Sequence, residues 1–239
     1  MADNDFGVDE LAEYLHMTSA QIARMAERGQ LPGRKAAGRW RFSQAEIHHW
    51  LEDRIGASDA LELARMEDMF GNEAAPNDEP AESQQIAALL PVAAIESSLA
   101  ARTRNSAITA MVGVAERTGW LWDAERLAEA IRSREELYPT ALDNGVALLH
   151  PRRPMPAIVA RPFVALGRTG HGIVFGNRRG ALTDLFFLLC STTDRGHLHT
   201  LARLSRLIAD DDFLAELRAA ADATAIHELI ASREQELLS

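Results

Sequence analysis

The stretch Arg134–His150, REELYPTALDNGVALLH, decides how the larger part of this chain folds. It starts with an arginine and a glutamate, passes through a turn-rich connector, and ends in the apolar run Gly145–Leu149, which stops at His150. A short continuous apolar run is typical of a strand covered on both faces. A histidine that ends such a strand, with an arginine brought back beside it, is suited to hold a transient phosphoryl group, because neutral imidazole is a nucleophile near pH 7 and guanidinium matches phosphate oxygens.

Helical and strand-like periods continue on both sides of this stretch. The patterns predict helices over 104–118 and 123–134, strands over 145–149, 157–166, 172–175 and 182–190, and helices over 194–208, 212–220 and 224–238. Helices, then strands, then helices indicate an α/β fold with a mixed sheet and flanking helices.

Composition and charge bound the class of protein. The chain has 239 residues, of which 47% are hydrophobic and 25% are charged, and its net charge is −10. No apolar run approaches the roughly 18 residues that span a bilayer, and the acidic N-terminus lacks a signal-peptide core. The single cysteine, Cys190, excludes a disulfide framework. We therefore expect a cytoplasmic protein without a membrane partner.

Composition divides the chain into residues 1–55, an acidic helix and linker over 56–83, and residues 84–239. The run Ser58–Phe70 is expected to form one more helix, with Leu61, Ala64 and Met69 as its apolar stripe, or alternatively a dimerisation arm. The rest of the linker is rich in Pro, Asn and Glu and is not expected to bury a core.

Residues 1–55 carry the pattern of two short helices, a glycine-centred hairpin and a third helix. The first helix is expected over Val8–His16, and the second starts at the capping box formed by Thr18 and Gln21. Two short helices joined by a turn of about three residues are the helix-turn-helix pattern. Gly38, set between basic and aromatic residues, predicts a short hairpin or wing.

Basic residues gather in this part of the chain. Between Ala20 and Phe42 there are six basic residues and one acidic residue, a local charge of +5 that suits a phosphate backbone. The segment resembles the excisionase/MerR-like winged helix-turn-helix family in Val8–Leu15, Gly29–Arg34 and Gly38–Ser43. The resemblance implies that the second helix enters the DNA major groove and that the wing contacts the backbone. The DNA-binding residues it implies are Ser19, Gln21, Arg24, Arg28, Arg34, Lys35, Arg39 and Arg41. The alternative is a small fold used for protein contacts, with solvated arginines.

The stretch that opened this section is part of a second resemblance, which spans roughly residues 85–238. In Arg134–Leu137, Thr140, Asn144–Ala147, His150, Ile173–Gly176, Asp184–Leu185, His197–Leu198 and Leu201–Leu204, the chain looks like the enzyme IIA domain of the fructose/mannitol type from the bacterial phosphotransferase system, including its nitrogen-regulatory members. The resemblance implies that His150 accepts a phosphoryl group from an HPr-type phosphocarrier and passes it to a histidine or cysteine of another domain.

The resemblance also implies roles for five side chains. His150 would be the nucleophile and carrier, Arg134 the electrostatic clamp, and His197 the second active-site histidine, a hydrogen-bond donor to the phosphate. Thr140 and Asn144 are candidates for positioning His150 or its loop. The groups at 150, 134 and 197 are expected to line one solvent-open pocket.

No metal or other cofactor is expected. Phosphoryl transfer of this kind needs placement and charge neutralisation, and the sequence offers no convincing metal-ligand set. Adjacent His48 and His49 are expected to point in different directions on a helix.

One departure from the family pattern surrounds the histidine. The family usually has Pro-His-Gly where this chain has Leu149-His150-Pro151, and proline removes a backbone N–H that could contact a phosphate oxygen. Arg152 and Arg153 follow and offer replacement charge.

The predicted function is a phosphohistidine-carrying regulator of the phosphotransferase system that couples phosphorylation of His150 to DNA binding. Two alternatives stay open: a IIA subunit of a sugar-uptake system, and a DNA-binding protein whose IIA-like half is a non-phosphorylated partner platform. The partners expected are an HPr-type phosphocarrier and DNA, with a IIB domain, a regulatory protein and a homodimer left open.

Overall fold

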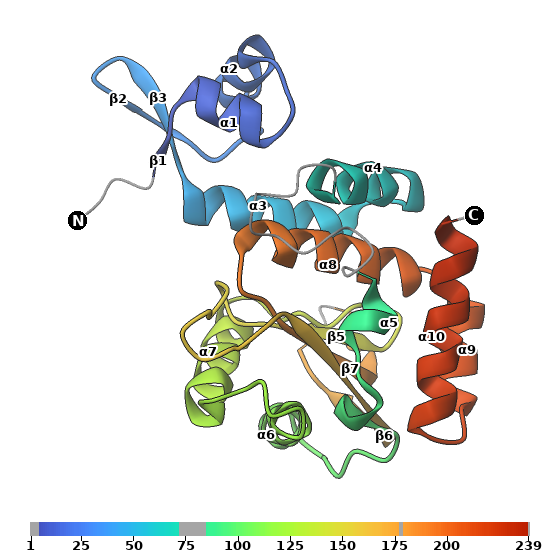
Figure 1. Ribbon diagram of the computed structural model, residues 1–239. Coiled ribbons are helices and arrows are strands. Elements are labelled where there is room, and N and C mark those ends of the chain that lie inside the picture. Colours follow the sequence, from blue (N-terminus) through green and yellow to red (C-terminus); the bar gives the residue numbers. More distant parts are fainter. Residues whose placement is uncertain (1–4, 72–84, 177–178, 239) are drawn as a thin grey trace.

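Two sheets and the helices around them make up the fold (Figure 1). The computed structural model describes residues 5–71, 85–176 and 179–238. A small antiparallel sheet belongs to the N-terminal part, and a four-stranded sheet lies in the C-terminal part. The predicted fold class, an α/β domain with a mixed sheet plus a small helix-turn-helix part, is confirmed.

The N-terminal part has the predicted order of helices and hairpin. Its elements are β1 (Asp5–Phe6), α1 (Val8–Tyr14), α2 (Ser19–Glu27), β2 (Arg34–Ala36), β3 (Arg39–Ser43) and α3 (Gln44–Ala57). The capping box at α2 is present, since Gln21 Oε1 accepts from the Thr18 N–H at 2.8 Å and Thr18 Oγ1 accepts from the Gln21 N–H at 3.3 Å. The β2–β3 hairpin turns at Ala37 and Gly38, both with positive φ, as tight hairpins require.

The four-stranded sheet is mixed. Its strands are β4 (Ile95–Glu96), β5 (Val146–Leu149), β6 (Phe163–Val174) and β7 (Leu182–Cys190), in the order β4-β6-β7-β5. Strands β6 and β7 are antiparallel, whereas β4 and β5 run parallel to their neighbours. Every residue of β5 is buried, as its unbroken apolar sequence predicts.

The prediction of two separate strands over 157–166 and 172–175 was wrong, because the structure has one strand, β6, in this region. Residues 157–161 form turns and bends instead, with one isolated bridge from Val159 to Leu121. Pro156 and Pro162 flank this segment, and a proline cannot donate to a strand ladder. The rest forms the single strand β6, whose pairing with β7 shifts register between Arg168 and Ile173. The glycines in this region mark that irregularity inside one strand and do not form a turn between two.

Helices cover both faces of the mixed sheet. One face packs against α6 (Arg104–Glu116) and α7 (Ala124–Leu137), and the other packs against α8 (Asp194–Leu207), α9 (Asp211–Ala219) and α10 (Ala223–Leu238). Alternate strand residues serve the two faces: Ala147 and Leu149 of β5 face the first core, and Val146 and Leu148 face the second. The short helix α5 (Ile86–Leu89) and the 3₁₀ turn Val92–Ala94 lead into β4.

Helices α3 and α4 (Ala60–Gly71) lie across the outer face of α8 (Figure 1). The helix expected over 58–70 therefore exists, but its predicted apolar stripe was wrong: Leu63, Met66 and Phe70 are buried, whereas the Leu61 side chain is 64% exposed. Buried Glu67 of α4 pairs with Arg203 at 2.6 Å and with Arg206 at 3.3 Å. The apolar face of α4 therefore packs against α8 of the same chain, and the dimerisation arm stays an untested alternative. No helix in the described part of the chain is long and apolar enough to cross a membrane.

Candidate functional site: an imidazole cluster around Glu52

His150 stands at the end of β5, and one hydrogen bond fixes its ring. Its Nδ1 lies 2.8 Å from the carbonyl oxygen of Leu148. A carbonyl oxygen only accepts, so Nδ1 carries the proton and donates. In the neutral ring, Nε2 is therefore the nitrogen with the free lone pair, and it points away from the strand toward α3.

Arg134 and His197 lie beside this ring. Arg134, in the last turn of α7, is buried, and its Nη1 donates to the carbonyl oxygen of Tyr138 at 2.6 Å. His197, in the first turns of α8, lies with its ring centroid 4.9 Å from that of His150, and its Nδ1 lies 3.3 Å from the Ser191 hydroxyl. The structure thus brings together the three groups that the sequence placed in one site; their chemical roles stay predictions.

A carboxylate that the sequence reasoning missed occupies the centre of this site. Glu52 belongs to α3 of the N-terminal part, and its Oε2 accepts from Arg134 Nη2 at 3.1 Å. His150 Nε2 lies 3.6 Å from the same oxygen, and His197 Nε2 lies 3.6 Å from Oε1. An anion from the N-terminal part therefore stands where the groups around His150 were expected to meet a phosphate.

The expectation of a solvent-open pocket was wrong for this conformation. The His150 side chain is only 3% exposed and that of His197 is 2% exposed, because α3 and its Glu52 cover them. A cavity of about 840 Å³ reaches the cluster from the side, and its lining includes Glu52, Arg134, Thr140, Asn144 and His150. Access of a partner protein to His150 therefore requires α3 to move.

The charges of this buried cluster are strongly coupled. Burial by itself raises the pKa of the Glu52 carboxyl, but the facing imidazoles of His150, His197 and His48 together hold that pKa well below its usual range. Burial lowers the pKa of His197 to about 4, with Glu52 opposing that effect. Glu52 is therefore ionised and His197 is neutral near pH 7.

Among the described residues, no hydrogen bond joins Thr140 or Asn144 to the imidazole of His150. Thr140 donates through its N–H and its hydroxyl to the carboxylate of Glu135, and its carbonyl accepts from the Leu148 N–H at 3.3 Å. Asn144 Nδ2 donates to the carbonyl oxygen of Ile208 at 2.9 Å, which ties the turn before β5 to the end of α8. Both residues hold the strand that carries His150, so any positioning effect passes through the backbone.

His48 and His49 both reach the same carboxylate, contrary to the expectation that they would diverge. His48 Nε2 lies 3.2 Å from Glu52 Oε1, and His49 Nδ1 lies 3.7 Å from Glu52 Oε2. Residues four and three positions before Glu52 lie on its side of a helix, so both spacings permit the contact. This i,i+4 histidine–glutamate pair was the signal in the sequence that could have indicated a site on α3.

The family of the chain follows from its sequence matches. Residues 88–233 match the family described as "Phosphoenolpyruvate-dependent sugar phosphotransferase system, EIIA 2", and residues 6–55 match the helix-turn-helix domain family. The chain belongs to this EIIA family. It carries an EIIA domain behind an N-terminal helix-turn-helix domain, and Glu52 is a residue of the helix-turn-helix domain that lies in the EIIA site.

Curated relatives resemble the EIIA domain. The nitrogen regulatory protein of Bradyrhizobium diazoefficiens (strain JCM 10833 / USDA 110) is 33% identical over 141 residues, which cover 58% of this chain and 89% of that protein. The fructose-specific EIIABC component of Bacillus subtilis (strain 168) is 29% identical over 148 residues. That match covers 61% of this chain, but the chain spans only 23% of the length of the EIIABC component.

Solved structures share the EIIA fold. The nitrogen regulatory protein IIA-Ntr from Neisseria meningitidis superposes with a TM-score of 0.55 at 22% identity, covering 61% of this chain and 98% of that one. The IIA mannitol structure from Escherichia coli gives a TM-score of 0.52 at 19% identity, covering 59% of this chain and 97% of that one. In both comparisons the helix-turn-helix part of this chain is additional to the shared fold.

The helix-turn-helix domain exposes the basic side chains expected to meet DNA. The exposed residues are Arg24 and Arg28 on α2 and Arg34, Lys35, Arg39 and Arg41 on the hairpin. Arg34 pairs with Asp5 at 2.7 Å, and the Lys35 ammonium lies over the Trp40 ring. The Ser19 and Gln21 side chains form hydrogen bonds within the helix-turn-helix domain. Ser19 Oγ donates to Asp9 Oδ1, and Gln21 completes the capping box. The arginines and the lysine are therefore the stronger candidates for phosphate contacts. The elements that carry them, α2 and the β2–β3 hairpin, lie at the end of the molecule away from the four-stranded sheet (Figure 1).

Proposed function

We propose that this protein is a phosphohistidine-carrying regulator of the phosphotransferase system, in which His150 accepts a phosphoryl group from an HPr-type phosphocarrier and the state of His150 governs DNA binding. The observation that carries the proposal is the convergence of His150 Nε2 and the Arg134 guanidinium on one anionic group, which the helix-turn-helix domain supplies. His150 and Arg134 would therefore contact either of two competing anions, a phosphoryl group or the Glu52 carboxylate.

The transfer step would use His150 and Arg134 after Glu52 has left them. Nε2 of His150 attacks the phosphorus atom as the bond from phosphorus to the donor breaks, and the donor keeps that electron pair. The Nδ1 proton stays in its bond to Leu148, so the phosphorylated ring needs no further proton transfer. Arg134 neutralises the phosphoryl oxygens, which is the main requirement of a loose phosphoryl-transfer transition state.

Coupling to the helix-turn-helix domain follows from electrostatic repulsion. Two unit charges 4 Å apart repel by about 4 kcal/mol at an effective dielectric constant of 20, and a phosphoryl group carries a charge of about −1.5 to −2. Glu52 and a phosphoryl group on His150 cannot share the Arg134 guanidinium at that cost. Phosphorylation is therefore expected to expel Glu52 and with it α3, which changes how the DNA-binding surface is held.

Mass spectrometry after treatment with a phosphorylated HPr-type donor tests the proposal. We expect one acid-labile phosphoryl group on the wild type, none on His150→Ala, and one on the matched control His171→Ala, which alters an exposed histidine of β6. Comparing the DNA affinity of the phosphorylated and unphosphorylated protein then tests the coupling. A phosphoryl label that persists in His150→Ala would contradict phosphorylation at His150. Equal DNA affinities of the phosphorylated and unphosphorylated protein would contradict the coupling to DNA binding.

A second candidate function is a DNA-binding protein whose EIIA domain is a partner platform without phosphorylation. The burial of His150 and the proline that follows it favour this reading. It predicts no label with any donor, even in a Glu52→Gln variant, and unchanged DNA binding in His150→Ala.

The first proposal also calls for a phosphoryl acceptor. One solved structure of this fold is a complex of IIA mannitol with phosphorylated IIB mannitol from Escherichia coli. A IIB-type domain is therefore the first acceptor to try in transfer assays.

A further inference from the structure

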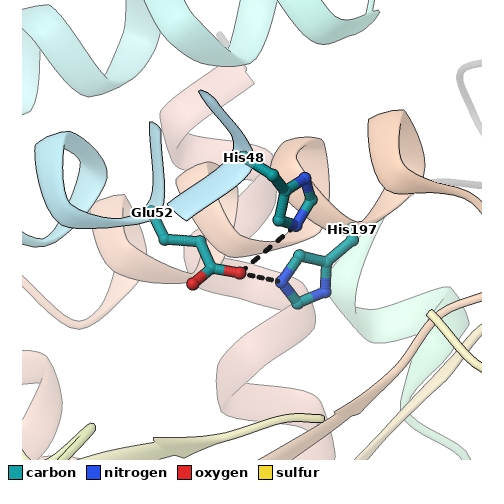
Figure 2. A group of neighbouring side chains, drawn as sticks. All are labelled: His48, Glu52 and His197. Carbon is teal, nitrogen blue, oxygen red and sulfur yellow. Dashed lines mark ion pairs between the residues drawn. The ribbon is translucent and has the colours of Figure 1, made fainter. Parts of the chain in front are cut away.

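Three buried side chains from two domains converge on one point. His48 and Glu52 lie one turn apart on α3, and His197 lies on α8. Figure 2 shows both imidazoles directing a ring nitrogen at the same oxygen of Glu52; His48 Nε2 lies 3.2 Å from Oε1 and His197 Nε2 lies 3.6 Å from it. One potential ligand atom of each residue lies within 4.8 Å of those of the other two.

The converging atoms lack hydrogen-bond partners. Among the described residues, none is found for His48 Nε2, His197 Nε2 or Glu52 Oε1. The three residues are 4%, 2% and 6% exposed. Buried polar atoms without hydrogen-bond partners are rare in folded proteins, and a bound ion is one of the established explanations for such a group.

From this geometry we infer that His48, His197 and Glu52 bind a zinc ion at the junction of the two domains. Tetrahedral zinc with ligands at about 2.0–2.1 Å requires ligand atoms about 3.3–3.4 Å apart, and the two nitrogen–oxygen separations bracket that value. Two imidazoles and one carboxylate form a donor set typical of zinc, whereas magnesium and calcium prefer oxygen donors.

The surroundings suit a monodentate carboxylate ligand. Arg134 holds Glu52 Oε2, so Oε1 is left for the ion. The outer nitrogen of His197 has an oxygen partner, since Nδ1 lies 3.3 Å from Ser191 Oγ. His48 Nδ1 makes no hydrogen bond among the described residues and lies 3.9 Å from Asp194 Oδ1. Zinc-bound imidazoles generally direct their second nitrogen to such an oxygen. The fourth position of a tetrahedral zinc ion is left to a water molecule.

The ion would fasten the helix-turn-helix domain to the EIIA domain. Two of its ligands come from α3 and one from α8, so binding requires the closed arrangement and stabilises it by linkage. This inference goes beyond the proposed function, because the unphosphorylated protein would bind zinc whether or not His150 can accept a phosphoryl group.

Calorimetric titration of the full chain with zinc, after treatment with a chelator and without any phosphoryl donor, tests the inference. We expect one zinc ion per chain in the wild type and at least a 10-fold loss of affinity in His48→Gln. The matched control is His171→Gln, which changes an exposed histidine of β6 and is expected to bind like the wild type. Zinc, but not magnesium, should raise the thermal midpoint of the wild type.

Three results would overturn the inference: no stoichiometric zinc binding by the wild type, equal affinity in His48→Gln and the wild type, or equal losses in both histidine variants. The thermal midpoints of the metal-free variants show whether each one folds. If His48→Gln does not fold, the visible spectrum of the cobalt-loaded wild type decides, because four-coordinate and six-coordinate cobalt absorb differently. A six-coordinate spectrum would contradict the tetrahedral site.

Discussion

The substitution Glu52→Gln should release His150 for phosphorylation. The change keeps the size of the side chain but removes the negative charge that faces Arg134 and the imidazoles. The Arg134–Glu52 pair is almost wholly buried, with side chains 7% and 3% exposed. Loss of one charge from such a pair costs about 3–5 kcal/mol.

The lower end of that range applies, because the amide oxygen of glutamine still accepts a hydrogen bond from Arg134. About 3 kcal/mol corresponds to roughly a 100-fold shift from the closed toward the open arrangement, since each 1.4 kcal/mol is a factor of ten. When only the open arrangement reacts, the apparent rate scales with its population. We therefore expect the initial rate of phosphohistidine formation to rise by up to about 100-fold.

The assay is a time course of phosphoryl incorporation by mass spectrometry, with a phosphorylated HPr-type donor and a chelator that removes metal ions. Asp53→Asn is the matched control, because the neighbouring carboxylate is 65% exposed and pairs only with His49 among the described residues. Equal rates for wild type, Glu52→Gln and Asp53→Asn would refute the argument that Glu52 closes the site. A lower rate in Glu52→Gln would do so as well.

Three further predictions concern stability, thiol reactivity and DNA. Glu67→Gln should lower the free energy of unfolding by about 3 kcal/mol and the thermal midpoint by roughly 6–12 °C, because two arginines lose a buried partner. The control Glu62→Gln changes a carboxylate on the surface of the same helix and should lower the free energy of unfolding by less than about 1 kcal/mol. Burial raises the pKa of the Cys190 thiol well above its usual range, so the native protein should resist alkylation at pH 8 and react only after denaturation. Labelling at the rate of a free thiol would contradict its burial. Arg24→Ala and Arg28→Ala should each reduce the slope of log affinity against log salt by about 1 in DNA titrations, and an unchanged slope would exclude α2 from the phosphate contacts.

Much of the fold could be predicted because local signals and tertiary packing agree. The capping box at Thr18, the hairpin at Gly38 and the apolar run that became β5 were each read correctly. The division of β6 was misread because glycines there mark an irregularity, which single-sequence reasoning cannot distinguish from a turn. The stripe of α4 was misassigned because its periodicity is weak and α8 decides which residues are buried.

Only the part of the candidate site that the EIIA domain contributes could be predicted from the sequence. His150, Arg134 and His197 come from the EIIA domain, and their convergence follows from that fold. Glu52 and His48 come from the other domain, and no sequence periodicity indicates how two domains dock. The predicted accessibility of His150 was wrong for that reason. It depends on a contact with Glu52 of the other domain, which lies about 100 residues earlier in the sequence.

The packing of α4 on α8 determines where the chain can be cut. A fragment that starts at residue 84 would contain the whole matched EIIA segment, yet it would strip Arg203 and Arg206 of the carboxylate that pairs with them. It would also uncover the apolar surface on which Leu63, Met66 and Phe70 rest, and the Arg195 guanidinium would lose the carbonyl groups at the end of α4. Recombinant production of the EIIA domain is therefore better begun before Ala60. Aggregation of shorter fragments would reflect the uncovered apolar surface of α8 and would carry no information about the intact protein.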